Sequence, residues 1–247
     1  MRGAQALLRP PFGWRAAVLP ELATALRRAT LPAVVLVAAL GVALPGVQLG
    51  DFLANNGQID RLGAYLTTTG LRWLGPLAAL GALVVAAGGP LTARLARPAA
   101  GEAEEVRTFE DAGQLVAGRM IAFAAAAAAL SFLIVPAGVG AGMAVAVFVF
   151  DVPSGVVAAS LFDAARFGDL LQGLVSAFVS GALAGLVCCY YGLEAAWHRQ
   201  QGETDAAARG GAAVRAALVA GLFVVAFVHV VLAAYLLAAF PDIRFTR

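Results

Sequence analysis

Five long stretches of this chain contain no charged residue, and they limit its possible folds more than any other feature. They run over 31–50, 73–93, 120–150, 170–193 and 216–241, and are 20 to 31 residues long. About 20 apolar residues in a helix cross the hydrocarbon core of a bilayer. The stretches therefore predict five membrane-spanning helices, and the pieces between them are too short to fold into an independent soluble domain.

The composition agrees with an all-α integral membrane protein. Of the 247 residues, 61% are hydrophobic and only 13% are charged, with a mean hydropathy of +0.85. A soluble domain is close to half apolar and a quarter charged. Residues 1–30 mix arginines with Leu, Trp and Phe, which favours an amphipathic helix lying in the membrane interface. A secretory signal fits this region less well, because the first apolar run starts only at Leu31.

We expect a single membrane domain over 1–247. Its predicted segments are an interfacial helix region at 1–30, spans at 31–53, 70–95, 115–150, 170–195 and 212–241, a cytoplasmic helix at 101–113 and an extracytoplasmic segment at 151–169 with a short helix around 160–167. The third span is long enough to tilt or break. Pro136 and the glycines after it predict a bend or a re-entrant end there.

The arginines predict the orientation of the chain. With the N-terminus inside, the cytoplasmic side holds Arg2, Arg9, Arg15, Arg27, Arg28, Arg94, Arg97, Arg107, Arg119, Arg199, Arg209 and Arg215. The outer side holds Arg61, Arg72, Arg166, Arg244 and Arg247. Twelve against five is a positive-inside asymmetry. It places the N-terminus in the cytoplasm and the C-terminus outside.

The residues needed for several functions are missing from the sequence. All 17 basic residues are arginine, so the lysine of the phosphate-binding GxxxxGK[ST] motif is missing and the chain is not its own ATPase. No nucleophile–base pair, paired carboxylates within a span or cofactor fingerprint is present. We therefore expect no enzyme activity, no cofactor, no metal site and no nucleic-acid partner. The adjacent Cys188 and Cys189 lie in an apolar run and are interpreted as packing residues.

A few polar and aromatic residues have structural interpretations. His229 lies in the last span, and a lone intramembrane histidine usually makes a hydrogen bond inside the helix bundle. Tyr190, Tyr191 and Trp197 near one end of span four, and Trp73 near the start of span two, are expected to anchor the chain at the membrane interfaces.

The segment GEAEEVRTFEDAG at 101–113 holds five of the chain's 15 acidic residues. Its Glu and Ala content favours a helix, in which Val106 and Phe109 share one face. Two interpretations remain open: a solvated turn between two spans, or a short transverse helix that docks into a cytosolic partner. The residue pattern alone does not choose between them.

Collinear motifs resemble the MlaE/YrbE-type permeases, the membrane subunits of lipid ABC transporters that work with Mce proteins. DLL at 169–171 and FVSGALAGLVCCYYGLEA at 178–195 resemble the family's "DL…K…FG…CYYG" signature. TARLARPAAGEAEEV at 92–106 is similar to "TAELGTMRVTEEIDA", and GGAAVRAALV at 210–219 is similar to "VGRATTRAVV". The chain differs from the family pattern in having Arg94 for an acid and Ser176 for a lysine.

The resemblance implies an MlaE-like permease fold in the bacterial cytoplasmic membrane. It implies that 101–113 is a coupling helix for an ABC ATPase subunit, with contacts through Glu102, Glu104, Glu105, Arg107, Phe109 and Glu110. It further implies a second YrbE-type permease chain, identical or different, Mce-domain proteins outside, and lipids such as phospholipids or fatty acids as cargo. The alternative is a membrane scaffold or assembly subunit that moves nothing.

Overall fold

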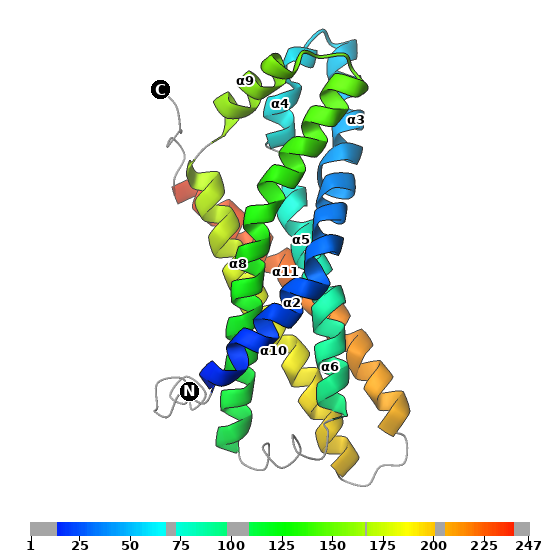
Figure 1. Cartoon of the computed structure of the whole chain (residues 1–247), viewed down its shortest axis with the longest axis vertical. Helices are drawn as coiled ribbons and strands as arrows, with labels where there is room; N and C mark the ends of the chain where they lie inside the picture. The colour runs from blue at the N-terminus through cyan, green and yellow to red at the C-terminus, as the bar shows by residue number, and fades with distance from the viewer. Residues whose placement is uncertain (1–13, 68–72, 98–108, 166, 201–205, 240–247) are drawn as a thin grey trace. The chain divides into compact units, whose positions relative to one another are not determined.

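The computed structural model describes residues 14–67, 73–97, 109–165, 167–200 and 206–239. Its longer helices are α2 (Trp14–Leu36), α3 (Leu44–Asn55), α5 (Gly75–Leu83), α6 (Gly89–Ala96), α8 (Phe109–Phe148), α9 (Ser154–Ala164), α10 (Phe167–Gln200) and α11 (Ala206–Ala239) (Figure 1). Short pieces at Ile59–Arg61 and α4 (Leu62–Tyr65) follow α3. No strand occurs in the described ranges, which confirms the all-α prediction.

Five helical stretches are long and apolar enough to cross a membrane. They are Val18–Asn55, Gly75–Ala96, Leu115–Phe148, Leu171–His198 and Arg209–Leu232. Each overlaps one of the five uncharged runs in the sequence. The number of spans therefore follows from hydropathy and length, as expected for backbone that must satisfy its own hydrogen bonds in lipid.

The first span has no break at its start. α2 continues through the π-helical segment Val37–Ala43 into α3, so the described part of the expected interfacial region, from Trp14 on, and the first span are one helical stretch. A π-helical segment, Val84–Gly88, likewise joins α5 to α6. Each π-helical segment is followed closely by a proline, Pro45 or Pro90. Within a continuous helix a proline removes one hydrogen bond and disturbs the regular α-helical pattern before it.

The third span is α8, a helix of 40 residues with Pro136 inside it. The helix runs on from Pro136 through the three glycines that follow and ends at Phe148. A re-entrant end at Pro136, one of the two possibilities drawn from the sequence, is therefore wrong. A proline removes one helical hydrogen bond, and the bonds on either side keep the helix intact.

Two compact units make up the chain, and each combines segments that are far apart in sequence. The first unit comprises Met1–Ala29, Leu83–Ala127 and Phe178–Phe227; the second comprises Thr30–Ala82, Ala128–Ala177 and Val228–Arg247. The boundaries between the units fall inside the long helices, so several helices contribute one portion to each unit.

The second unit has its own apolar core. Its buried members are Val42, Leu53, Leu62, Leu66, Ala146, Val152 and Val157. α4 packs closely on α9 at Gly63, where an added Cβ would lie 2.2 Å from the carbonyl oxygen of Val157. Only glycine permits this approach. α9 is the helix expected around 160–167, and it begins earlier, at Ser154.

Candidate functional site

The predicted coupling segment is only partly within the described residues. Its side chains Glu102, Glu104, Glu105 and Arg107 lie outside them, and Phe109 and Glu110 are the first two residues of α8. The coupling role of all six therefore stays a prediction. The structure does describe both flanks of the segment, since α6 ends at Ala96 and α8 starts at Phe109.

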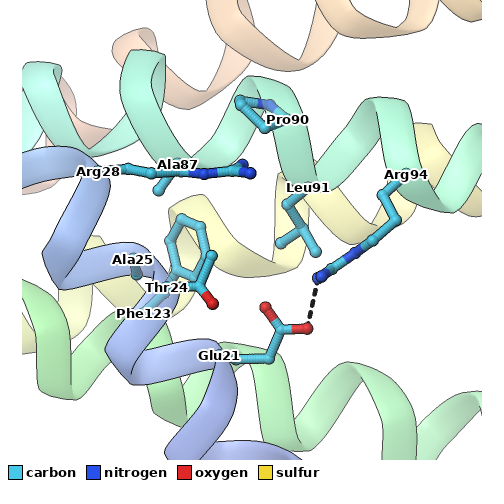
Figure 2. A pocket seen from close by; sticks show the side chains of 9 residues that line it. All are labelled: Glu21, Thr24, Ala25, Arg28, Ala87, Pro90, Leu91, Arg94 and Phe123. Atoms are coloured by element: carbon cyan, nitrogen blue, oxygen red, sulfur yellow. Dashed lines mark hydrogen bonds and ion pairs between the residues drawn. The ribbon is translucent and has the colours of Figure 1, made fainter.

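A charge cluster joins three helices of the first unit at these flanks. The carboxylate of Glu21 on α2 forms an ion pair with Nη2 of Arg94 on α6 (Figure 2). The same oxygen, Oε1, lies 3.5 Å from Nε of Arg119 on α8. Arg94 is in the last turn of α6, where a cation also interacts favourably with the helix dipole. One carboxylate therefore links the helix before the predicted coupling segment to the helix after it.

The two ion pairs differ in their exposure to solvent. The side chain of Arg119 is 6% exposed and that of Glu21 is 14% exposed, whereas that of Arg94 is 42% exposed. Removing one partner of a buried pair leaves an uncompensated charge, which is far more costly than losing a surface pair. The Glu21–Arg119 contact is therefore the one on which the local structure depends most.

A cavity of about 110 Å³ lies beside the cluster, within the first unit. Its polar lining comes from Glu21, Thr24, Arg28 and Arg94. Its apolar lining comes from Ala25, Ala87, Pro90, Leu91 and Phe123. Figure 2 shows the side chain of Arg28 crossing above Thr24 and Glu21, while Arg94 approaches Glu21 from α6. The cavity therefore combines guanidinium groups with an apolar wall.

A close contact between α6 and α10 lies in the same unit. The buried hydroxyl of Thr92 lies 3.0 Å from the carbonyl oxygen of Cys188 and 3.1 Å from that of Gly88, and donates to them. An added Cβ at Gly192 would lie 2.6 Å from the Cβ of Leu95. Cys188 and Cys189 are both 0% exposed, which agrees with their interpretation as packing residues. Small residues and one shared hydrogen bond thus fix the position of α6 on α10.

The aromatic residues singled out from the sequence occupy different environments. Tyr190 and Trp197 are exposed on α10, as membrane anchors would be. Tyr190 also packs edge-on against Tyr191, with ring centroids 5.3 Å apart. In the second unit, the ring of Trp73 meets the buried ring of His229 edge-on at 6.0 Å. This contact gives Trp73 a packing role that its sequence position did not predict.

Glu21 is the functional candidate that sequence reasoning missed. It is separated from Arg94 by 73 residues, so no local pattern connects them. One signal was available: Glu21 is the only acidic residue among the first 50 residues, in a region with five arginines. A glutamate that becomes buried on folding is almost always paired.

The chemistry available to the described residues is electrostatic. Among them, no group of three or more His, Cys, Asp or Glu side chains is placed to hold a metal ion. The charge cluster can bind an anion or transmit movement between helices, and it presents no nucleophile.

A comparison with known proteins agrees with this architecture. The family model described as Permease MlaE matches residues 21–235, a range that includes Glu21 and all five candidate spans apart from the first three residues of the first. No curated protein matches the chain. The five apolar helices and the extent of the family match establish a multi-pass membrane protein that belongs to the MlaE permease family.

Proposed function

We propose that this chain is the permease subunit of an Mce-type ABC transporter, which moves lipids across or out of the bacterial cytoplasmic membrane. The observation that carries the proposal is the family match over residues 21–235. A separate ATPase subunit supplies the energy, because this chain has no lysine and so no phosphate-binding motif of its own. Its N-terminus is cytoplasmic and its C-terminus is outside, in keeping with the twelve-to-five arginine asymmetry.

The cargo follows from the chemistry of the spans. The uncharged runs form the central portions of the spans, and the cluster of Glu21, Arg94 and Arg119 lies toward the predicted cytoplasmic ends of the helices. A pathway for an ion or a sugar ordinarily presents charged or strongly polar groups within the membrane. An acyl chain needs only apolar surface, which these helices supply. This favours a lipid, as the resemblance to the MlaE/YrbE-type permeases also implies.

The coupling mechanism uses the segment between α6 and α8. In the proposal, Glu102, Glu104, Glu105, Arg107, Phe109 and Glu110 contact the ATPase. Movement of this segment displaces the end of α6 and the start of α8. Since Glu21 pairs with both Arg94 and Arg119, the displacement also reaches α2. The ion pairs support a mechanical connection from the cytoplasmic segment to three helices.

The remaining partners are a second permease chain and Mce-domain proteins on the outer side. A non-transporting scaffold would bind the same partners. The two are distinguished by incorporating the purified complex into liposomes and following a fluorescent phospholipid. A transporter moves the lipid only when ATP is hydrolysed, whereas a scaffold gives the same signal with and without ATP.

The coupling assignment is tested by co-purification of the ATPase with detergent-solubilised permease. The double variant E104R/E105R reverses two charges in the coupling segment and should release most of the ATPase. The matched control is E203R, an acid in the predicted cytoplasmic loop between spans four and five. Equal ATPase retention by E104R/E105R and the unsubstituted chain would show that the segment is not the docking site.

A further inference from the structure

The cavity beside Glu21 carries an excess of positive charge. Two guanidinium groups, those of Arg28 and Arg94, line the cavity together with a single carboxylate, that of Glu21. The cavity wall therefore carries two positive charges and one negative charge, and that negative charge also faces a third guanidinium, Arg119, outside the wall. The shared oxygen of Glu21 already faces both Arg94 and Arg119. Arg28, which lines the cavity, has no ion pair with a carboxylate among the residues that the structure describes.

Arg119 does not line the cavity, and it influences the charge there through Glu21. The residue is 5% exposed, and its Nε and Nη1 atoms make no hydrogen bond within the described part of the chain. Its Nε is within ion-pair distance of Glu21 at 3.5 Å, which is too long for a good hydrogen bond. Because Arg119 is not part of the cavity wall, it acts on the cavity through its charge and not through a direct hydrogen bond.

We propose that this cavity binds a phosphate group, with Arg28 and Arg94 in its wall and Arg119 adding positive charge through the Glu21 contact. A guanidinium group pairs with phosphate oxygens through two parallel hydrogen bonds, so phosphate is the anion that arginine recognises best. The cavity volume of about 110 Å³ is several times the space that one water needs.

The apolar lining indicates where the phosphate comes from. Leu91, Ala87 and Phe123 form a hydrophobic side of the same cavity. A free phosphate ion gains nothing from such a surface, whereas the glycerol and the first acyl carbons of a phospholipid do. We therefore assign the phosphate to a phospholipid headgroup. The assignment to a lipid rests on the proposed function and its topology, which puts Arg28 and Arg94 near the cytoplasmic surface. The assignment of a phosphate site does not depend on the proposed function.

The test is lipid binding by the purified full-length chain in a non-ionic detergent. Phosphatidylglycerol is titrated, and bound lipid is counted by native mass spectrometry. Arg28→Gln removes one exposed guanidinium from the cavity, and the apparent affinity should fall about tenfold or more. Arg27→Gln is the matched control, because Arg27 is the exposed neighbour of Arg28 on α2 and does not line the cavity. Its affinity should stay within about twofold.

Two further probes separate the possible sources of the phosphate. Diacylglycerol, which lacks the phosphate, should not compete with phosphatidylglycerol. Inorganic phosphate should compete only weakly; if it displaces the lipid fully at millimolar concentration, the site is a phosphate site and the lipid source is wrong. If Arg28→Gln and Arg27→Gln bind phosphatidylglycerol equally well, there is no phosphate site in this cavity.

Separate measurements check that Arg28→Gln still folds and that the lipid test is independent of the ATPase test. Arg28 is exposed on α2, so Arg28→Gln should keep the melting temperature of the unsubstituted protein. The ATPase co-purification test is a separate measurement, made on a variant at Glu104 and Glu105. If Arg28→Gln and Arg27→Gln bind the lipid equally well while E104R/E105R releases the ATPase, this inference alone is overturned. If Arg28→Gln weakens lipid binding while E104R/E105R retains the ATPase, the coupling assignment alone is overturned.

Discussion

Among the described residues of the first unit, Glu21 is the one whose replacement we expect to destabilise the structure most. Its carboxylate is largely buried, and it faces a still more buried Arg119 and a half-exposed Arg94. In a membrane protein, where few charges are present, one such group determines which helices stay together. The sequence places this residue in an amphipathic helix, and the contact with Arg119 gives it a structural role.

Replacing Glu21 by Gln should lower the stability of the protein by about 3 kcal/mol, because Arg119 would keep a buried charge without a partner. The measurement is the unfolding transition in detergent. Arg94→Gln is the comparison and should cost about 1 kcal/mol or less, since its side chain is 42% exposed.

A double substitution checks the reason for this effect. In E21Q/R119M, both charges are gone, so the protein should be more stable than with E21Q alone. If the double variant is less stable than E21Q, the buried charge is not what destabilises the single variant.

At the scale of elements, small residues determine how closely the helices of one unit approach. α10 meets α8 at Gly181, where an added Cβ would lie 2.6 Å from the Cβ of Ala127 and 2.7 Å from the carbonyl oxygen of Phe123. It meets α6 through Thr92 and Gly192. Close backbone packing of this kind replaces the hydrophobic driving force, which lipid does not provide between helices.

Gly181→Ala should destabilise the protein by about 1–3 kcal/mol, because the helices must move apart to admit a methyl group. Thermal unfolding in detergent measures the loss. The control is Gly211→Ala on α11, where an added Cβ meets nothing within 4 Å. That change should be neutral or should stabilise the helix by about 0.5–1 kcal/mol. Equal losses at the two positions would contradict the close contact between α8 and α10.

Thr92→Val should cost about 1 kcal/mol, since valine keeps the shape of the side chain and loses its hydrogen bond to the carbonyl of Cys188 on α10. Thr24→Val is the comparison, because the Thr24 hydroxyl donates only to Pro20 of its own helix at 2.8 Å. It should be nearly neutral. Unfolding of both variants under one condition tests whether the interhelical bond matters.

At the scale of the whole molecule, the orientation in the membrane decides which partners each segment can meet. Five spans with the N-terminus inside place residues 101–113 in the cytoplasm and α9 outside. The proposed ATPase coupling and the proposed contact with Mce-domain proteins both depend on this arrangement. It is predicted by the distribution of arginines, because translocating positively charged loops is unfavourable.

Cysteine labelling in intact cells tests the orientation. A cysteine introduced at position 104 should react with a membrane-impermeant maleimide only after the cells are permeabilised. A cysteine in place of the exposed Asp163 on α9 should react without permeabilisation. The native Cys188 and Cys189 are 0% exposed and should give little background. The opposite pattern at 104 and 163 would invert the topology and remove the basis for the proposed coupling.

The sequence by itself determined the helical class, the number of spans and the family. These depend on hydropathy and on short motifs, which are properties of contiguous residues, so the uncharged runs identified the spans directly. The short helix before span four was also predictable, although it begins at Ser154 rather than near 160. The sequence defines helix ends less sharply than helix centres, because the residues at each end can be helical or non-helical.

Only the tertiary structure decided which distant residues meet. Glu21 pairs with Arg94 across 73 residues of chain, and Gly181 lies at a close helix contact only because Phe123 and Ala127 fold against it. Likewise, the local sequence did not predict that α2 would continue into the first span, or that α8 would run unbroken through Pro136. Crossing a bilayer depends on the length and polarity of one segment, whereas charge pairing and close packing depend on neighbours that folding alone supplies.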